Sequence, residues 1–496
     1  MKTVTFSSEL LKLFCQASHD KNPLHTNEIY ARQTPYGEPV VFGVLAGLAA
    51  LGFLPSQDKT LSSITMEFLH PVFVNIEYQV EINNSKKTEI KIYDGKKIIT
   101  KITAEFSDVA NNFISNSSQT PFASCIKARV WKNSDLMPEV AINGNYYASQ
   151  DLIKEIINLL NLENKGVSPF HISVLMWTSY LVGMELPGEK ALFSRLSLKF
   201  NHTQNISMPC FYQATITGFD ERFDLLKYQA KLFFEDYLIA ETDIRAFVRQ
   251  PSPKNLEIFS NTSLYSNSLE NKVALVIGAS RGLGSTIAGY LATKNCKVIV
   301  NYLTSDDEAK NLKKSLGSLS ENIILLPGDA TNLNWVLSAK EHIIKEYGKL
   351  DLLVCNACPA ILPLRLEPTA IERINSYVSK SLALVSVPLS VYVDEIKKTQ
   401  GSMLVISSIF VNTTPVDWPH YVSAKYAIEG LIKVAANEYP AVKFLIARPP
   451  KLLTDQTNTP IGRQNAIPPS LVAAKLLQYL EDNIFDTNLK VIEDFA

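Results

Sequence analysis

The sequence predicts two successive α+β segments, each a helix wrapped by a curved antiparallel sheet, followed by a doubly wound α/β domain. Residues 107–125 and 250–270 are rich in Ser, Asn, Thr and Pro and have no clear period, so they divide the 496-residue chain into 1–110, 126–250 and 271–496. A repeated order of elements supports the first two segments. Alternating strands and helices support the third.

The first two segments share a pattern. Residues 48–82 and 180–217 both contain the end of an apolar helix, a turn with proline, an alternating strand that ends in Phe, and a further strand. One apolar helix followed by several antiparallel strands is typical of a helix enclosed by a sheet. Two copies in tandem predict a pseudo-dimer.

In the third segment the strands are continuous apolar runs, as in 272–278, 297–302, 322–328 and 350–356. Helix-forming stretches separate them. Strands of this kind are buried on both faces, which predicts a parallel sheet covered by helices on each side.

Composition excludes several classes of function. The apolar fraction of 46%, the charged fraction of 20% and the net charge of −1 are those of a globular protein, with no general attraction to nucleic acid or anionic membranes. We read no signal peptide and no stretch of the ~18–20 apolar residues that span a bilayer. Six scattered cysteines suit a reducing cytoplasm. We therefore expect a cytoplasmic protein with neither nucleic acid nor membrane as partner.

Cys355 and Cys358 form a CxxC motif, which could indicate a redox or zinc site. The sequence offers neither a second CxxC nor a histidine pair at ligand spacing. We prefer the interpretation of two small residues at the end of a buried strand, and expect no metal.

A glycine turn, Gly278 to Gly284, follows the first strand of the third segment and precedes a helix. Glycines at such a turn let backbone N–H groups approach a pyrophosphate at the helix N-terminus. Asn301 stands at the end of the second strand, where NAD-preferring sites carry an acid, and Arg281 lies within the turn. A basic group without an opposing carboxylate favours a 2′-phosphate, so we expect NADP(H).

Three further motifs follow in order: Asn356-Ala357, Ser407-Ser408 after a strand, and a YxxxK motif from Tyr421 to Lys425. With the glycine turn, this order resembles the short-chain dehydrogenase/reductase family, especially its 3-oxoacyl-carrier-protein reductases. The resemblance implies a Rossmann-type domain over 271–496. It also implies a set of cofactor-binding residues: Gly278, Ser280, Arg281, Gly282, Leu283, Gly284, Asn301, Asp329, Ala330, Asn356, Ala357 and Thr454.

Carbonyl reduction explains the catalytic residue types. A hydride must reach carbon and a proton must reach oxygen, and Tyr421 is the expected proton donor. Lys425, one helical turn on, places an ammonium on the same face, which should bring the phenol pKa from its ordinary ~10 toward neutrality. Ser408 should hydrogen-bond the substrate oxygen.

The motifs depart from the family pattern in several places. Ile277 replaces a Thr, Cys358 replaces a Gly, and Pro449-Pro450 replaces Pro-Gly. Tyr377 aligns with the family's catalytic Asn, which puts the proton relay behind Lys425 in question.

Near the N-terminus, Asp20, Asn22, Pro23 and His25 form an Asp-x-Asn-Pro-x-His motif. It resembles the MaoC-like, (R)-specific enoyl-CoA hydratase family, whose hot-dog fold matches the helix-in-sheet pattern. The resemblance implies an α+β double hot-dog with one active site, in which the degenerate second copy completes an acyl tunnel. Asp20 and His25 would share acid–base work around a water.

Two residues flank this predicted site. Asn22 is a candidate substrate contact, and the backbone N–H of Gly43 is a candidate oxyanion donor. Phe42 replaces the family's usual His before Gly43.

Together the halves predict a bifunctional NADPH-dependent 3-oxoacyl-thioester reductase and (R)-3-hydroxyacyl-thioester dehydratase of fatty-acid or polyketide-type synthesis. The substrate would be an acyl carrier protein or CoA thioester, and the family suggests a homo-oligomer, either dimer or tetramer. Three alternatives remain: a degradative NAD-dependent hydratase/dehydrogenase, a reductase beside an inactive acyl-binding hot-dog module, and a nucleotide-sensing C-terminal half.

Overall fold

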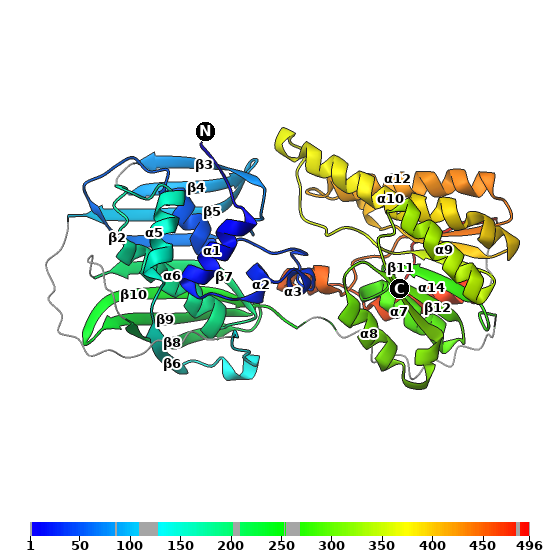
Figure 1. Ribbon diagram of the computed structural model, residues 1–496, viewed down its shortest axis with the longest axis horizontal. Helices are drawn as coiled ribbons and strands as arrows, with labels where there is room; N and C mark the ends of the chain where they lie inside the picture. Colours follow the sequence, from blue (N-terminus) through cyan, green and yellow to red (C-terminus); the bar gives the residue numbers. More distant parts are fainter. Residues whose placement is uncertain are drawn as a thin grey trace. The chain divides into compact units, whose positions relative to one another are not determined.

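The protein was studied as a computed structural model, which describes residues 2–84, 87–108, 127–201, 209–251, 253, 268–482 and 487–495. The chain divides into two compact units, residues 1–32 with 38–251 and residues 33–37 with 252–496 (Figure 1). The two predicted boundary segments lie largely outside the described residues. A further division of the first unit into 1–110 and 126–250 stays a prediction.

The first unit contains a ten-stranded sheet in the order β1-β3-β4-β5-β2-β7-β10-β9-β8-β6, with antiparallel pairing throughout. Its strands are β1 (Lys2–Thr5), β2 (Thr60–Phe68), β3 (Glu77–Asn84), β4 (Thr88–Asp94), β5 (Lys97–Ser107), β6 (Ala141–Tyr146), β7 (Ala191–Phe200), β8 (Cys210–Asp220), β9 (Leu225–Phe234) and β10 (Tyr237–Val248). Its helices are α1 (Ser8–Ser18), α2 (Pro23–Thr26), α3 (Glu28–Arg32), α4 (Gly43–Leu51), α5 (Gln150–Leu159) and α6 (Pro169–Tyr180), with a 3-10 helix η1 (Asn133–Asp135) and a π-helix η2 (Leu181–Glu185).

The two halves of the sheet have the same strand order when each is read from its edge toward the centre. Reading from one edge gives β1-β3-β4-β5-β2, and reading from the other gives β6-β8-β9-β10-β7. The two series meet where β2 pairs with β7, and the pair Thr65↔Ser197 lies at the centre of that register. Each series includes the strands that follow one apolar helix, α4 or α6.

Helices α4 and α6 are buried around most of their circumference. In α4 every residue from Val44 to Leu51 is buried, and in α6 all but Pro169 and Ser173 are buried. A helix that is apolar all round is stable only when it is enclosed. The strands supply that enclosure, because β9 and its neighbours alternate buried and exposed side chains.

The second unit confirms the predicted parallel sheet. Its strand order is β13-β12-β11-β14-β15-β16-β17, and every described pair is parallel. The strands are β11 (Val273–Ile277), β12 (Lys297–Tyr302), β13 (Ile323–Pro327), β14 (Leu352–Cys355), β15 (Ser402–Ile406), β16 (Lys443–Ala447) and β17 (Leu489–Ile492). The helices are α7 (Gly282–Thr293), α8 (Asp306–Ser315), α9 (Leu333–Tyr347), α10 (Ile371–Lys398), α11 (Phe410–Thr413), α12 (Pro419–Glu438), α13 (Pro460–Arg463) and α14 (Pro469–Glu481), with 3-10 helices η3 (Gly317–Asn322), η4 (Pro368–Ala370) and η5 (Asp455–Thr457).

Helices cover both faces of this sheet (Figure 1). Ala274 and Val276 of β11 belong to the core that includes α7, α8 and α14. Leu275 and Ile277 belong to the opposite core, with α9, α10 and α12. Alternate side chains of one strand thus enter two cores, which explains why the strand is apolar throughout.

One helix of the second unit departs from a sequence expectation. Pro368–Lys398 is the span, among the described residues, that is long and apolar enough by composition to cross a bilayer, whereas the sequence predicted none. Half of its most apolar window is buried in the protein, and it contacts α9, α12 and β14. Core helices of globular domains have the same character.

Candidate active sites

At two positions of the turn after β11, Gly278 and Gly284, only glycine fits. Gly278 has φ +75, and a Cβ there would lie 2.7 Å from Ala357. A Cβ on Gly284 would lie 2.2 Å from the carbonyl oxygen of Gly278. The turn therefore brings the backbone close to β14 and leaves the N-terminus of α7 open. This cradle fits the pyrophosphate of a dinucleotide.

Residues from later strands meet this turn. The Asn356 side chain after β14 donates to the Gly278 carbonyl at 2.8 Å. The Thr454 methyl group, after β16, would be 3.6 Å from a Cβ on Gly282. The structure thus brings Asn356, Ala357 and Thr454 together with the turn, as parallel strands bring their carboxyl ends to one edge.

Other predicted cofactor residues have structural roles of their own. Asn301 is buried and donates to the carbonyls of Leu326 and Gly328 at 3.2 and 3.1 Å. Asp329 accepts from the backbone and side chain of Thr331 at 2.9 and 2.7 Å, which fixes the loop after β13. Ser280 lies half-buried within the turn, whereas Leu283 and Ala330 are buried.

The sequence expectation that no carboxylate opposes Arg281 is wrong. Asp455 lies 3.4 Å from the Arg281 guanidinium. The two residues are 174 positions apart, so no local pattern could have shown the pair. Both groups are partly exposed, and such pairs are weak.

Ser408, Tyr421 and Lys425 lie together at the carboxyl end of β15. The Tyr421 phenol is within hydrogen-bonding reach of the Ser408 hydroxyl. Lys425 Nζ lies 5.5 Å from the centroid of the Tyr421 ring and donates to the Ile406 carbonyl at 2.8 Å. The i, i+4 spacing on α12 places both side chains on the same face.

The expected lowering of the pKa of Tyr421 is not found. Desolvation raises the pKa of this phenol, the Cys358 thiol acts in the same direction, and the hydrogen bond with Ser408 opposes them. Desolvation also lowers the pKa of Lys425, against the effects of Cys358 and Glu429. The phenol is therefore protonated near neutrality, which is the form a proton donor needs.

Cys358 and Tyr377, two of the residues that depart from the family pattern, both lie near these groups. Tyr377 interacts electrostatically with Cys358 and with Tyr421. Its ring meets the ring of His420 edge to face, with centroids 4.6 Å apart. His420 also contacts the ring of Trp418, with centroids 6.1 Å apart.

In the first unit, Asp20 and Asn22 occupy the loop between α1 and α2. Asp20 is buried, and its carboxylate accepts from the Asn22 N–H at 3.1 Å and from the Ser179 hydroxyl at 2.7 Å. Desolvation raises the pKa of Asp20 to about 7, although both hydrogen bonds oppose the rise. Asp20 is therefore close to half protonated at neutral pH.

Asn22 fastens this loop rather than facing open space, contrary to its prediction as a substrate contact. Its side-chain amide donates to the carbonyls of Gly183 and Gly188 at 2.9 and 3.0 Å, and its oxygen caps α2. Asn22 is 1% exposed. Its visible role is to hold Asp20 and the start of α2 in place.

His25 of α2 has a defined tautomer. Its Nδ1 lies 2.7 Å from the Val40 carbonyl and must donate a proton to it, so Nε2 carries the free lone pair. Desolvation lowers the pKa of His25 to about 4. The ring stacks on Phe42 at 4.0 Å, and Phe42 immediately precedes α4.

Gly43 is the first residue of α4, so its N–H has no acceptor within the helix. A Cβ at this position would lie 2.8 Å from the ring of Phe68. The glycine therefore allows close packing, and its N–H stays next to the His25–Phe42 stack. This arrangement suits the predicted oxyanion donor.

Ser179 and Gly183 come from the helical segment that precedes β7, and sequence reasoning missed both. Ser179 lies in α6, and Gly183 lies in η2, which continues α6. A Cβ on Gly183 would meet the Asp20 carboxylate at 2.3 Å, so only glycine admits Asp20 there. No motif marks either residue, because their partner is about 160 positions away.

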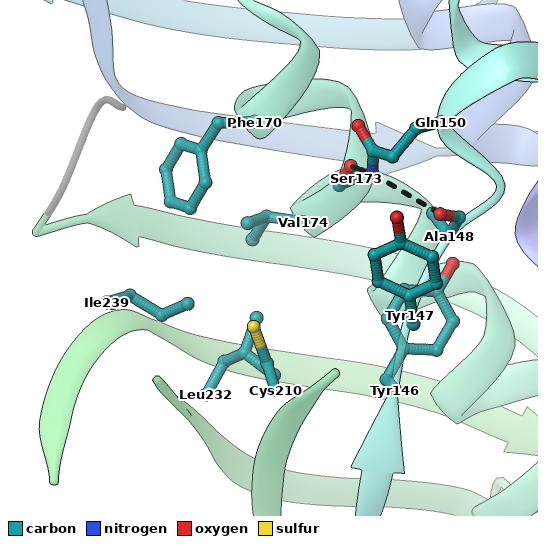
Figure 2. Close-up of a pocket in the computed structure, with 10 residues that line it drawn as sticks. All are labelled: Tyr146, Tyr147, Ala148, Gln150, Phe170, Ser173, Val174, Cys210, Leu232 and Ile239. Carbon is teal, nitrogen blue, oxygen red and sulfur yellow. Dashed lines mark hydrogen bonds between the residues drawn. The ribbon is translucent and has the colours of Figure 1, made fainter. Parts of the chain in front are cut away.

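A pocket opens beside α6, with an empty volume of about 330 Å³ that includes its solvent-open mouth. Figure 2 shows its mainly apolar lining: Tyr146, Tyr147, Ala148, Gln150, Phe170, Ser173, Val174, Cys210, Leu232 and Ile239. The Tyr146 hydroxyl donates to the Ser18 carbonyl at 3.1 Å, and the Ser18 hydroxyl accepts from the Asp20 N–H at 3.2 Å. Tyr146 thus connects the pocket with the Asp20 loop.

Cys355 and Cys358 are free thiols, one buried and one half-buried. Within the parts of the chain that the structure describes, no cluster of three His, Cys, Asp or Glu side chains could hold a metal ion.

Comparisons with known proteins agree with the division of the chain into two units. Residues 272–460 match the family model for short chain dehydrogenases, and residues 1–105 match the model for the MaoC like domain. The 3-oxoacyl-[acyl-carrier-protein] reductase of Salmonella typhimurium is 30% identical over 204 residues, which cover 40% of this chain and 81% of that relative. An uncharacterized oxidoreductase of Saccharomyces cerevisiae is also 30% identical, with 42% of this chain and 80% of that relative covered.

Among solved structures, the alcohol dehydrogenase of the archaeon Thermococcus sibiricus complexed with 5-hydroxy-NADP is 24% identical to this chain. The superposition has a TM-score of 0.40 and covers 45% of this chain and 95% of that one. On its family match and its Salmonella relative, the chain belongs to the short-chain dehydrogenase/reductase family, which uses nicotinamide nucleotides, and it carries a MaoC-like domain at its N-terminal end.

Proposed function

We propose that the protein is a bifunctional 3-oxoacyl-thioester reductase and (R)-3-hydroxyacyl-thioester dehydratase. One observation carries the proposal: each half holds a proton donor that desolvation favours in its protonated form, Asp20 in the first unit and Tyr421 in the second. The product of the first reaction is the substrate of the second. A chain that holds both sites therefore supports consecutive steps on one acyl group.

In the reductase, Tyr421 is the proton donor, and Ser408 orients the substrate carbonyl by a hydrogen bond to its oxygen. The raised pKa of Tyr421 keeps the phenol protonated until the carbonyl oxygen gains charge. A reduced nicotinamide nucleotide held at the glycine turn would supply the hydride. Lys425 stabilises the phenolate that remains after the proton has moved.

The residues that would hold the cofactor surround the glycine turn. The turn and the N-terminus of α7 offer backbone N–H groups to the pyrophosphate, and Thr454 lies over the turn. We propose NADP(H) as the preferred form, because the last two residues of β12 are Asn301 and Tyr302 rather than an acid, and Arg281 lies within the turn. A 2′-phosphate would compete with Asp455 for the Arg281 guanidinium.

In the dehydratase, neutral His25 removes the α-proton through Nε2, and protonated Asp20 gives its proton to the departing hydroxyl. The Gly43 N–H stabilises the thioester oxygen as it gains charge. This assignment needs His25 unprotonated and Asp20 protonated. Both conditions hold between about pH 4 and pH 7, given the pKa values of about 4 and about 7.

The protonation states of Asp20 and His25 act equally on dehydration and hydration, because both directions pass through one transition state. We propose the synthetic direction because NADP(H), the cofactor inferred from Asn301 and Arg281, serves as a reductant.

We further propose that the first unit is a double hot-dog whose second copy serves the first. The matching strand orders on both sides of the β2–β7 pair support this proposal. The pocket beside α6 would receive the distal part of the acyl chain, since Tyr146 links it to the Asp20 loop. We also propose a cytoplasmic homo-oligomer, and a substrate carried by acyl carrier protein or CoA.

The test is incubation of the protein with a 3-oxoacyl thioester and NADPH, with cofactor absorbance and product masses followed together. A product one water lighter than the hydroxyacyl thioester supports both sites. Accumulation of the hydroxyacyl thioester alone would favour an inactive acyl-binding module, for which the Phe42 replacement is the argument. Faster reverse oxidation with NAD than reduction with NADPH would contradict the synthetic direction.

A further inference from the structure

Helix α12 places two buried charged side chains on the face that meets the end of β15. Lys425 and Glu429 are four residues apart, so they lie on one side of the helix. Their exposed fractions are 4% and 2%. Charges buried to this degree need ionic partners or hydrogen bonds, and these side chains have both.

Both side chains bind consecutive residues at the end of β15. Lys425 Nζ donates to the Ile406 carbonyl at 2.8 Å, and the Ser407 hydroxyl donates to Glu429 Oε1 at 2.5 Å. The next residue is Ser408. The helix that carries Tyr421 is therefore fastened at two points to the residues that precede Ser408.

Arg448, directly after β16, fixes the Glu429 carboxylate. Its Nε donates to Oε1 at 2.8 Å and its Nη2 donates to Oε2 at 2.6 Å, a bidentate pairing. Glu493 after β17 also pairs with Arg448. Arg448 after β16 and Ser407 after β15 thus both bind the Glu429 carboxylate, and Glu493 after β17 binds Arg448 in turn.

Glu429 also supplies charge near Lys425. Desolvation raises the pKa of Glu429, but hydrogen bonds from Arg448 and Ser407 outweigh it, so the group is a carboxylate at neutral pH. Among the described residues, the titratable groups that face Lys425 are Tyr421, Glu429 and Cys358. Glu429 is the carboxylate of this set.

We propose that Glu429, held by Arg448, is a positioning residue of the reductase: it sets the place of Ser408 through Ser407 and provides a fixed negative charge one helical turn from Lys425. This inference rests on the proposed function, in which Ser408, Tyr421 and Lys425 act on the substrate. Glu429 itself acts only through its neighbours.

The test compares Glu429→Gln and Ser407→Ala with Glu438→Gln, which changes an exposed glutamate of the same helix. The readouts are kcat, KM, cofactor affinity and the thermal unfolding midpoint. A fifth readout is the alkaline limb of the pH profile, which is the range of high pH over which kcat falls. Dehydration of a supplied hydroxyacyl thioester by the same protein reports an intact first unit.

Glu429→Gln should lower kcat about tenfold or more and leave KM nearly unchanged, because the reacting groups are displaced while the binding surface stays. Its alkaline limb should move to lower pH, since Lys425 loses the charge that favours the ammonium. Ser407→Ala should lower kcat several-fold and leave the alkaline limb in place. Glu438→Gln should match the unsubstituted protein.

If the unsubstituted protein is active and Glu429→Gln has the same kcat and the same alkaline limb as Glu438→Gln, the inference is overturned. The proposed function would then stand. If Glu429→Gln does not fold, Ser407→Ala decides, and an unchanged kcat would overturn the inference. Absence of reductase activity in the unsubstituted protein would instead overturn the proposed function, and the inference with it.

Discussion

Desolvation acts on the proton-transfer groups of both the Asp20–His25 site and the Tyr421–Lys425 site, with different consequences. In the first site desolvation raises the pKa of Asp20 to about 7 and lowers that of His25 to about 4, so the uncharged forms of both prevail between about pH 4 and pH 7. In the second site burial lowers the pKa of Lys425, although the chemistry there needs the ammonium.

The two sites accordingly have different supports. Neutral hydrogen bonds orient the first pair: the Ser179 hydroxyl on Asp20 and the Val40 carbonyl on His25. The second site has an ionic support, the Glu429–Arg448 pair. A buried pair that works uncharged needs only orientation, whereas a buried cation also needs a counter-charge.

The largest expected effect separates the two sites completely. Tyr421→Phe removes the proton donor, so NADPH-dependent reduction should fall about 10²- to 10⁴-fold. Dehydration of a supplied (R)-3-hydroxyacyl thioester should not change. Parallel rate measurements on one preparation check this. Equal losses in both reactions would mean that the sites are not independent.

Asp20→Asn is the complementary change. The amide cannot donate a proton as a carboxylic acid does, so dehydration should fall about 10²- to 10⁴-fold, while NADPH oxidation continues. The hydroxyacyl thioester should then accumulate in the product mass spectrum. Unchanged dehydration would instead identify the first unit as a binding module.

A smaller effect tests the contribution of helix α6 to the Asp20 site. Ser179→Ala removes a hydrogen bond that stabilises the Asp20 carboxylate, so the pKa of Asp20 should rise further. Dehydration should slow about tenfold, and its alkaline limb should move from near pH 7 to higher pH, because the acid form persists longer. The pH–rate profile checks this.

The matched control is Thr178→Ala, on the same helix, since the Thr178 hydroxyl donates to the Leu175 carbonyl rather than binding Asp20. This variant should keep the alkaline limb of the unsubstituted protein. A shift of equal size in both variants would show a general loosening of α6.

The smallest effect concerns the cofactor. Arg281→Ala should weaken NADPH binding about tenfold, the cost of one phosphate contact, and change NADH binding little. Fluorescence titration with both nucleotides measures this. Equal weakening of both would contradict the assignment of Arg281 to the 2′-phosphate.

Much of the second unit could be predicted from the sequence, because its signals are local. A strand, a glycine turn and a helix follow one another between Val273 and Thr293, and the continuous apolar strands indicate burial on both faces. The YxxxK spacing alone placed Tyr421 and Lys425 on one helical face. The resemblance of the N-terminal segment to the MaoC-like family, whose model matches residues 1–105, likewise followed from a short motif.

The supporting residues could not be predicted, because they depend on contacts between distant segments. Ser179 reaches Asp20 across 159 positions, and Asp455 reaches Arg281 across 174. The prediction that the pKa of Tyr421 is lowered was also wrong. Spacing shows that Lys425 is near, but it does not show how strongly desolvation opposes the phenolate.

The most direct test of the account is a single time course with a 3-oxoacyl thioester, NADPH and the unsubstituted protein near pH 6, within the range where Asp20 is protonated and His25 is neutral. The account predicts that NADPH is consumed and that the enoyl thioester appears after a transient hydroxyacyl species. No consumption of NADPH or NADH, and no water loss from supplied hydroxyacyl thioester, would contradict it.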